Sequence, residues 1–183
     1  VPNDVHDGIL NETKDTELLK QLYKNWIWTG SLVIYEKPDK PFGKKVTFRF
    51  EEDNKVKYSV SFNVPKQFRG KTNCALVIEH PDFELVNLGY NRYEIKVADG
   101  HIHLIENFPK YNGWYNPHPE TKIPQGKQVS KSESARRLWR LDNAYISPVA
   151  RGCFSFNSRR WIVCLNNWPS GGYGVAFAPI ADP

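Results

Sequence analysis

Hydrophobic and polar residues alternate along several stretches of the chain with the two-residue period of a half-buried β-strand. The clearest example is the stretch KKVTFRFEEDNKVKYSVSFNV, where Val, Phe and Tyr recur at every second position on both sides of an Asp-Asn pair. This pattern predicts a β-hairpin. A three-residue loop around Asp53-Asn54 would set Phe48 opposite Val60 or Tyr58, so that apolar residues face apolar residues.

The stretch YEIKVADGHIHLIENF predicts a second hairpin. An Asp-Gly pair between two alternating segments favours a type I′ turn, because both central residues of that turn need a positive φ. A two-residue loop at residues 99–100 pairs Val97 with Ile102 and Ile95 with Leu104. Apolar residues of both strands then share one face.

The stretch GCFSFNSRRWIVCLNNW predicts a third hairpin, with its loop at residues 157–160. This register opposes Phe154 to Val163 and Cys153 to Cys164. Directly opposed residues of antiparallel strands have Cα atoms roughly 4.5–5.5 Å apart, which is within reach of a disulfide. We therefore expect these two cysteines to be neighbours, which remain thiols in a reducing compartment and can form a bond in an oxidising one.

Two other segments show the spacing of helices. DTELLKQLYKNW, residues 15–26, has apolar residues three and four positions apart behind Asp15 or Thr16 as N-cap. SKSESARRLWRL opens with Ser and Glu at capping-box spacing and predicts a helix at about 131–140. Additional strands are expected at 26–36, 72–80, 83–90 and 174–179.

Residues 107–129 are predicted to form a long loop. This segment contains four prolines, two glycines and a cluster of aromatic residues. Within it, the stretch YNGWYNPHPE is predicted neither to propagate a helix nor to sit inside a sheet. Loops of this length tend to be functional or disordered, and the aromatic density argues against disorder.

These elements together predict a mainly-β fold, an antiparallel sandwich or a partly closed barrel built from hairpins, with two short helices. At 183 residues and 40% hydrophobic content, the chain is long enough to bury one core. We expect residues 1–14 to form a loose arm. Residues 15–183 would then form a single mainly-β domain that carries the aromatic, proline-rich loop at 107–129.

Charge and cysteine content restrict the partners only mildly. The chain has 25 Lys and Arg against 20 Asp and Glu, a net charge of +5, and a pI near 9.0, which is a small basic excess. No stretch approaches the ~20 apolar residues of a transmembrane helix, so no membrane partner is expected. Three cysteines make no disulfide framework, which slightly favours an intracellular location. Cys74 lies in an apolar run and is expected to be a buried thiol.

The aromatic segment is the first candidate binding site. Its rings either pack the loop onto the core or face a ligand. Sheet proteins with aromatic loops commonly bind extended ligands such as peptides and glycans. Our first hypothesis is a non-catalytic recognition module that binds a peptide or glycan, without a cofactor or metal, through Tyr111, Trp114, Tyr115 and His118.

The first alternative is a nucleic-acid-binding domain. Arg136 and Arg140 would share one face of the predicted second helix, and Arg159 and Arg160 would lie at the tip of the third hairpin. Arginine is well suited to contact phosphate groups, because its guanidinium donates two parallel hydrogen bonds.

The second alternative is an enzyme with an acid–base pair near the strand ends. The candidate residues are His80, Asp82, His101, His103, Glu106 and His118. His101 and His103 would point to the same side of a strand, as metal ligands do. However, Glu106 falls on the other face, and the hairpin register places Lys96 across from His103, where it would oppose a bound cation. No G-x-S-x-G, H-E-x-x-H or C-x-x-C motif is present. The sequence therefore favours a protein that is not an enzyme.

Overall fold

The computed structural model describes most of the chain between residues 27 and 138, and two strands beyond it. The described residues are 27–52, 55–79, 82–98, 100–132, 134–138, 149–155 and 161–164, together with residues 5, 8, 12 and 14–17.

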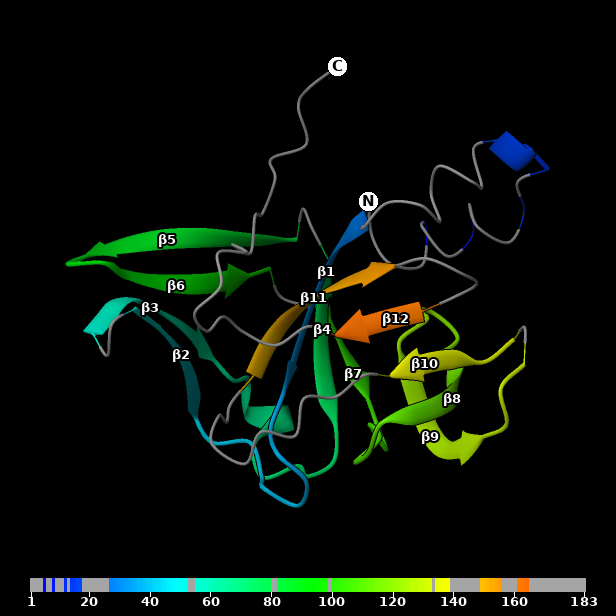
Figure 1. The fold of residues 1–183 in the computed structure, drawn as a ribbon. Helices are drawn as coiled ribbons and strands as arrows, with labels where there is room; N and C mark the ends of the chain where they lie inside the picture. Colours follow the sequence, from blue (N-terminus) through cyan, green and yellow to red (C-terminus); the bar gives the residue numbers. More distant parts are fainter. Residues whose placement is uncertain are drawn as a thin grey trace.

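Twelve strands and one short 3-10 helix are the elements whose bounds the described residues give (Figure 1). The strands are β1 (Ile27–Tyr35), β2 (Lys45–Glu52), β3 (Lys55–Asn63), β4 (Ala75–Glu79), β5 (Phe83–Gly89), β6 (Arg92–Val97), β7 (Ile102–Ile105), β8 (Gly113–Pro117), β9 (Pro124–Val129), β10 (Arg136–Leu138), β11 (Val149–Ser155) and β12 (Trp161–Cys164), and the helix is η1 (Lys66–Phe68). Valine, isoleucine, phenylalanine and tyrosine are frequent in the longer strands, as expected for residues that pack on a pleated surface.

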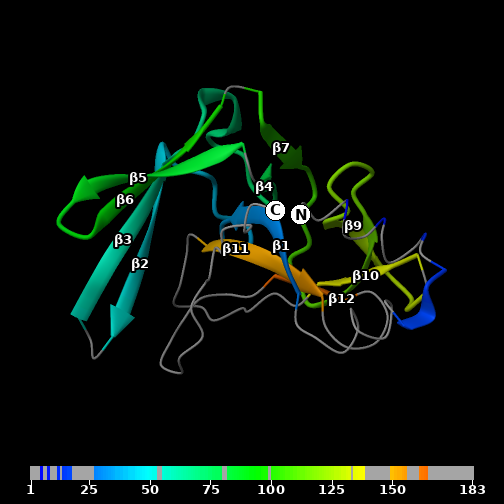
Figure 2. The ribbon, with the colours of Figure 1, turned by 90° about the horizontal axis from the view of Figure 1, so that it is seen from above.

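The described strands form two sheets. The order in the larger sheet is β7-β4-β1-β11-β12-β10-β8-β9, and the order in the smaller sheet is β2-β3-β6-β5. Most neighbours run antiparallel, whereas β3 with β6 and β10 with β12 run parallel. Seen from above, the smaller sheet lies on one side of β1, β4 and β7, and β8 to β10 lie on the other side (Figure 2). The fold of the described residues is therefore mainly β, with largely antiparallel sheets that do not close into a barrel.

Over Leu32–Tyr35 and Ala75–Ile78, the central strands β1 and β4 are buried on both faces. Every residue of Leu32–Tyr35 and of Ala75–Ile78 is buried, which is unlike a strand with one wet face. Alternate residues contribute to two cores. The first core contains Val33, Tyr35, Ala75, Val77, Ile105, Phe108, Tyr115, Ile123 and Leu138. The second core contains Leu32, Ile34, Phe42, Val46, Phe62, Val64, Cys74, Leu76, Ile78 and Ile95. The central layer is thus enclosed between the smaller sheet and the β8–β10 region.

The first predicted hairpin is formed by β2 and β3, and Phe48 lies opposite Val60 as predicted. The register shifts before Glu51, and the ladder ends with Glu52 opposite Lys55. The predicted pairing of apolar positions is therefore correct. It is reached through a β-bulge and a two-residue connection, not through a three-residue loop, because the bulge supplies the extra residue.

The second predicted hairpin is wrong. The turn itself forms, since the N–H of His101 donates to the C=O of Ala98 at 3.2 Å. After the turn the strands diverge: β6 pairs with β3 and β5, whereas β7 pairs with β4 in the other sheet. Ile95 lies in the second core, and Ile102 and Leu104 pack against that core from the opposite layer. Ile95 is buried, and Ile102 and Leu104 are partly buried, by packing between sheets instead of pairing within one sheet.

The third predicted hairpin is formed by β11 and β12. Cys153 lies opposite Cys164, and Phe154 lies opposite Val163, in the predicted register. The predicted loop at 157–160 lies outside the described residues. Cys74 is a buried free cysteine, as predicted, and burial raises the pKa of its thiol.

The helix predicted at about 131–140 is wrong where the structure describes it. Residues Arg136–Leu138 form β10, which pairs with β8 on one side and β12 on the other. Ala135, Arg136 and Leu138 are buried. Two neighbouring strands satisfy the backbone groups of this segment, and burial of Leu138 in the first core outweighs a helix propensity of only tenths of a kcal/mol per residue.

The prediction of a loop over residues 107–129 is also wrong. This segment contains β8 and β9, which form an antiparallel pair. The prolines occupy positions that a sheet tolerates, because Pro117 ends β8 and Pro124 begins β9. Gly126, with a φ of 77°, lies where the register shifts, and a bulge with positive φ favours glycine. Part of the stretch YNGWYNPHPE therefore does lie inside a sheet.

The helix predicted at 15–26 is not confirmed. The N–H of Glu17 donates to Oδ1 of Asp15 at 2.9 Å, as expected of an N-cap, and Thr16 and Glu17 have helical backbone. Residues 18–26 lie outside the described part of the chain. Most of the predicted arm at 1–14 and the predicted strand at 174–179 also lie outside it.

Candidate ligand-binding surface

Trp114 lies on the outer face of the β8–β10 region. Successive residues of a strand point to opposite faces. Tyr115 is buried in the first core, so its neighbour Trp114 points away from that core and is partly exposed. The position of the indole follows from the burial of the adjacent ring.

Two cationic side chains lie close to the Trp114 ring. Arg137 is the register partner of Trp114 on β10, and its guanidinium carbon lies 5.9 Å from the ring centroid. The Nζ atom of Lys131 lies 5.7 Å from the same centroid. Both distances are within the range of a cation–π interaction. We call Trp114, Lys131 and Arg137 the Trp114 platform.

The segment before β8 is fixed by polar contacts on both sides of Tyr111. The hydroxyl of Tyr115 donates to the C=O of Tyr111 at 2.8 Å. Lys110 Nζ donates to Asp39 Oδ1 at 2.7 Å, and Asn73 Nδ2 donates to the same oxygen at 2.9 Å. Hydrogen bonds from Lys110 and Asn73 hold the pKa of the Asp39 carboxyl below its ordinary value. Tyr111, which is 68% exposed, therefore lies on an anchored segment.

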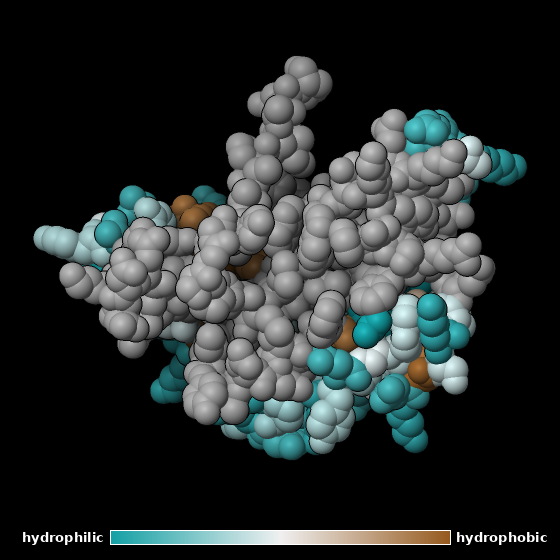
Figure 3. Space-filling view, viewed as in Figure 1, coloured by the Kyte–Doolittle hydropathy of each residue, from teal (hydrophilic) through white to brown (hydrophobic). Residues whose placement is uncertain are grey.

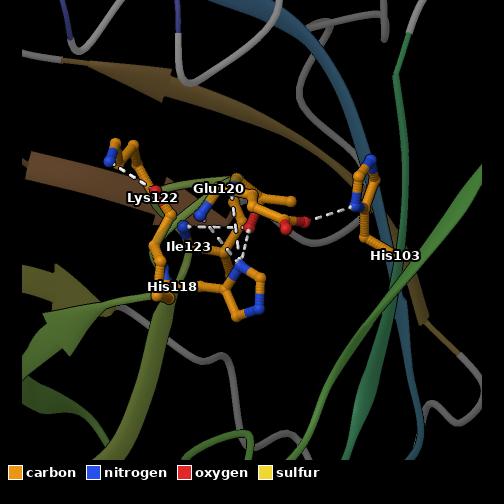
Figure 4. A network of polar contacts seen from close by, with 7 residues as sticks. His103, His118, Glu120, Lys122 and Ile123 are labelled. Atoms are coloured by element: carbon orange, nitrogen blue, oxygen red, sulfur yellow. Dashed lines mark hydrogen bonds and ion pairs between the residues drawn. The ribbon is translucent and has the colours of Figure 1, made fainter.

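The imidazole of His118 is held within the turn between β8 and β9 (Figure 4). Its Nδ1 accepts the backbone N–H groups of Thr121 at 3.3 Å and Glu120 at 3.4 Å, and the backbone N–H of His118 donates to the C=O of Ile123 at 2.7 Å. The Glu120 carboxylate contacts Nδ1 of His103 on β7 at 3.1 Å. This network ties the turn to the edge of the central layer.

The pKa of His118 is lowered from its ordinary value, because partial burial disfavours the charged ring. The negative charge of Glu120 opposes this shift, whereas His103 and Lys122 add to it. A neutral ring also suits the hydrogen bonds, since only an unprotonated Nδ1 can accept them. The neutral ring of His118 therefore stabilises the turn between β8 and β9 by accepting these hydrogen bonds.

The four aromatic-segment candidates are divided between different environments. Tyr111 is exposed and Trp114 is partly exposed. Tyr115 is only 3% exposed and belongs to the first core, and His118 is half-buried in the network of its turn. Of the predicted set, Tyr111 and Trp114 are therefore the residues that lie at the surface.

The predicted basic contacts are not assembled on one surface by the described residues. Arg136 is 4% exposed, and its Nη1 donates to the C=O of Ser134 at 3.1 Å and of Ala135 at 3.3 Å. Its guanidinium therefore stabilises the chain before β10 and is not a surface contact. Arg140, Arg159 and Arg160 lie outside the described residues.

Of the titratable residues proposed for an enzyme, His103 and His118 share the network around Glu120, whereas the others that the structure describes make separate contacts. His101 Nδ1 lies 3.0 Å from Asp82 Oδ1, and Lys71 Nζ lies 3.7 Å from Glu106 Oε1. His103 contacts Glu120, as described above. In the ranges described, no group of three or more His, Cys, Asp or Glu is placed to hold a metal ion.

The expected pairing of Lys96 with His103 is wrong. Lys96 lies opposite Glu84 on β5, and His103 lies opposite Val77 on β4. This difference follows from the divergence of β6 and β7 into separate sheets. His80, the remaining candidate, lies outside the described residues.

Sequence reasoning missed Lys131 and Arg137 as members of this surface. Both lie in the segment assigned to a helix, where Arg137 would pair with Glu133 at i,i+4. On a strand, Arg137 instead stands directly across from Trp114. No local pattern indicates this contact, because it depends on the pairing of two strands that are distant in sequence.

Comparison of the chain with protein-family models, with curated proteins and with solved structures finds no match. Among the described residues, no helix is long and apolar enough to cross a membrane. The geometry of the Trp114 platform is therefore the basis for a functional proposal.

Proposed function

We propose that this protein is a non-catalytic recognition module that binds an extended, negatively charged peptide or glycan on the Trp114 platform. The observation that carries this proposal is the placement of Lys131 and Arg137 at 5.7 and 5.9 Å from the Trp114 ring centroid. The indole provides a rigid apolar surface for stacking, and the two cations provide charge and hydrogen-bond donors. This combination suits a ligand that presents flat or apolar groups next to negative charges.

The shape of the surface favours an extended ligand. Trp114 and Arg137 lie side by side on the outer face of adjacent strands, and Tyr111 adds an exposed ring three residues before Trp114. A ligand that follows β8 would meet Tyr111 and Trp114 in succession. The described surface over β8 to β10 is mostly hydrophilic with scattered hydrophobic residues (Figure 3), which fits recognition through a few rings and charges.

The decisive experiment is Trp114→Ala. Ligands are first selected from arrays of acidic peptides and of sulfated or uronic-acid glycans, and affinity is then measured by calorimetry. Loss of a central aromatic contact typically costs about 2 kcal/mol, so we expect affinity to fall roughly 30-fold. Trp114→Phe keeps a ring at this position and should retain part of the affinity.

Tyr90→Ala provides a matched control. Tyr90 is 93% exposed, and Arg92 lies 5.9 Å from its ring centroid, but this pair belongs to the smaller sheet. Its replacement should leave binding unchanged. Equal affinity of the wild type and Trp114→Ala for every selected ligand would contradict the proposal.

A second candidate function is binding of single-stranded nucleic acid. It is favoured by the same combination of a stacking ring and adjacent cations, which single-strand binders use for bases and phosphates. If Lys131 and Arg137 each neutralise one phosphate, log affinity should fall by about 1.4 per log unit of salt. Replacement of both residues by Gln should abolish that dependence. Absence of retention on single-stranded DNA or RNA would remove this candidate and leave the peptide or glycan proposal intact.

A further inference from the structure

The described parts of the two sheets end in four edge strands. These are β7 and β9 in the larger sheet, and β2 and β5 in the smaller sheet. An edge strand presents backbone N–H and C=O groups that can pair with another chain. Natural proteins obstruct such edges with short strands, charges, prolines or bulges.

Three of the four edges are obstructed in this way. β7 has only four residues. β9 begins at Pro124 and is bent at Gly126, which is followed by the exposed Lys127. β2 begins at the exposed Lys45, and its register shifts before Glu51.

Over most of its length, the edge strand β5 has none of the features that obstruct the other three edges. It has seven residues and contains no Lys, Arg or Pro. Leu85 and Leu88 are 47% and 46% exposed, and hydrophobic atoms are visible at the surface over β5 (Figure 3). Both ribbon views show β5 at the outer margin of the smaller sheet. Glu84 is its one charged residue.

The hydrogen-bond pattern shows which backbone groups face outward. The N–H of Ala98 donates to the C=O of Asp82 at 3.3 Å, and hydrogen-bonded pairs recur at every second residue of an antiparallel ladder. Glu84 therefore directs its backbone groups toward β6. The N–H and C=O of Leu85 and Asn87 point to the outer edge.

We propose that β5 pairs with β5 of a second copy of this chain, antiparallel, about a two-fold axis at Leu85. In this register Leu85 meets its own copy, Phe83 meets Asn87, and Glu84 meets Val86. The backbone groups of Leu85 that point outward then exchange two hydrogen bonds with the same groups of the copy. The two smaller sheets become one continuous eight-stranded sheet, with closed two-fold symmetry.

Charge and backbone shape select this register over its neighbours. A two-fold axis at Glu84 would set two carboxylates directly opposite each other, which is destabilising. A two-fold axis at Val86 would bring Gly89 into the ladder, beyond the irregularity between Asn87 and Gly89. The axis at Leu85 avoids both problems and buries the most exposed apolar side chain of the regular part of β5.

Sedimentation velocity of the full chain from 1 μM to 1 mM tests the association. Edge pairing alone forms a small interface, so we expect a weak dimer with a dissociation constant on the order of tens of micromolar. Leu85→Lys places two cations opposite each other at the axis and should leave a monomer with an unchanged melting temperature. Tyr90→Lys, at the tip of the same hairpin, should still dimerise. A wild-type protein that stays monomeric at 1 mM overturns the proposal.

Cysteine cross-linking tests the register independently. At the axis, Leu85→Cys would set two thiols on directly opposed residues about 5.5 Å apart between Cα atoms, within the range for a disulfide. Mild oxidation with a small disulfide should therefore give a covalent dimer of this variant. Asn87→Cys lies opposite Phe83 of the copy and should not cross-link. Equal cross-linking of the two variants, or none in Leu85→Cys, overturns the assigned pairing.

Discussion

The ring of His118 combines a lowered pKa with a structural role as hydrogen-bond acceptor. Its ordinary pKa is 6.5, and partial burial lowers it in the folded chain. The unfolded chain therefore binds more protons than the folded chain as the pH falls below about 6.5, and the free energy of unfolding decreases over that range. Protonation at Nδ1 would also remove the acceptor for the N–H groups of Glu120 and Thr121.

His118→Asn tests this role, because asparagine can accept the same N–H groups but does not titrate. We expect the variant to lose part of the fall in stability between pH 7.5 and pH 5 that the wild type shows in urea unfolding. His101→Asn removes a more exposed histidine, whose Nδ1 contacts Asp82, and serves as the control. A His118→Asn profile that superimposes on that of the wild type would contradict the assigned pKa direction.

At the scale of the element, β4 differs from an ordinary strand because both of its faces are internal. Leu76 lies in the second core and Val77 in the first core. Leu76→Ala should reduce the free energy of unfolding by about 2–5 kcal/mol. Val77→Ala, on the opposite face, should cost at least about 1.5 kcal/mol from two lost methyl groups. Chemical denaturation measures both values.

Comparison of Leu76→Ala with Val77→Ala tests whether both faces of β4 are buried. In a strand with one wet face, one of two adjacent substitutions would be nearly neutral. Val86→Ala on β5 provides that reference, because Val86 is only partly buried on an edge strand. A neutral Val77→Ala would show that the β8–β10 region does not cover this face of β4.

Local hairpins were predictable from sequence where pairing is decided by alternation and a short turn. This applies to β2 with β3, whose apolar residues pair as predicted up to the β-bulge, and to β11 with β12, whose register matches the prediction. The Asp-Gly turn after β6 did not predict a hairpin correctly. A turn of this kind can connect two strands that pair with each other, but it can also connect two strands that enter different sheets, as β6 and β7 do. The burial of Ile95 and Leu104 from opposite layers, which decides between these outcomes, depends on residues far away in the sequence.

The proposed Trp114 platform was only partly predictable for the same reason. Aromatic density alone selected Tyr111 and Trp114, which lie at the surface, but it also included Tyr115, whose ring packs in the first core. The three-residue strand β10 is too short to show alternation, and its surroundings favour a helix in isolation. Arg137 therefore reaches Trp114 through a pairing that no local pattern contains.

At the scale of the whole molecule, β11 and β12 join two groups of strands. β7, β4 and β1 lie on one side of this pair, and β10, β8 and β9 lie on the other. A chain that ends at residue 148 would lose both strands and leave β1 and β10 with new edges. We expect this shortened chain to aggregate and to lack a cooperative thermal transition, as measured by size-exclusion chromatography and calorimetry.

A chain that begins at residue 15 is the control for this truncation. Residues 1–14 are predicted to be a loose arm, so their removal should preserve the cooperative transition. A soluble, cooperatively melting chain of residues 1–148 would show that the two groups of strands are stable without β11 and β12.

Because β1 pairs with β11, the ribosome completes β1 long before it synthesises the partner strand. Tyr35 pairs with Val149, and Ile27 pairs with Ser155, so these residues of β1 pair with partners that are synthesised over a hundred residues later. At ribosomal rates this delay is on the order of 10 s. During that interval β1 and β4 can associate through their shared ladder, but the other side of β1 has no partner strand. The nascent chain must therefore keep one of its most hydrophobic segments from misassociation until translation is almost complete, and it is in this window that chaperones would matter most.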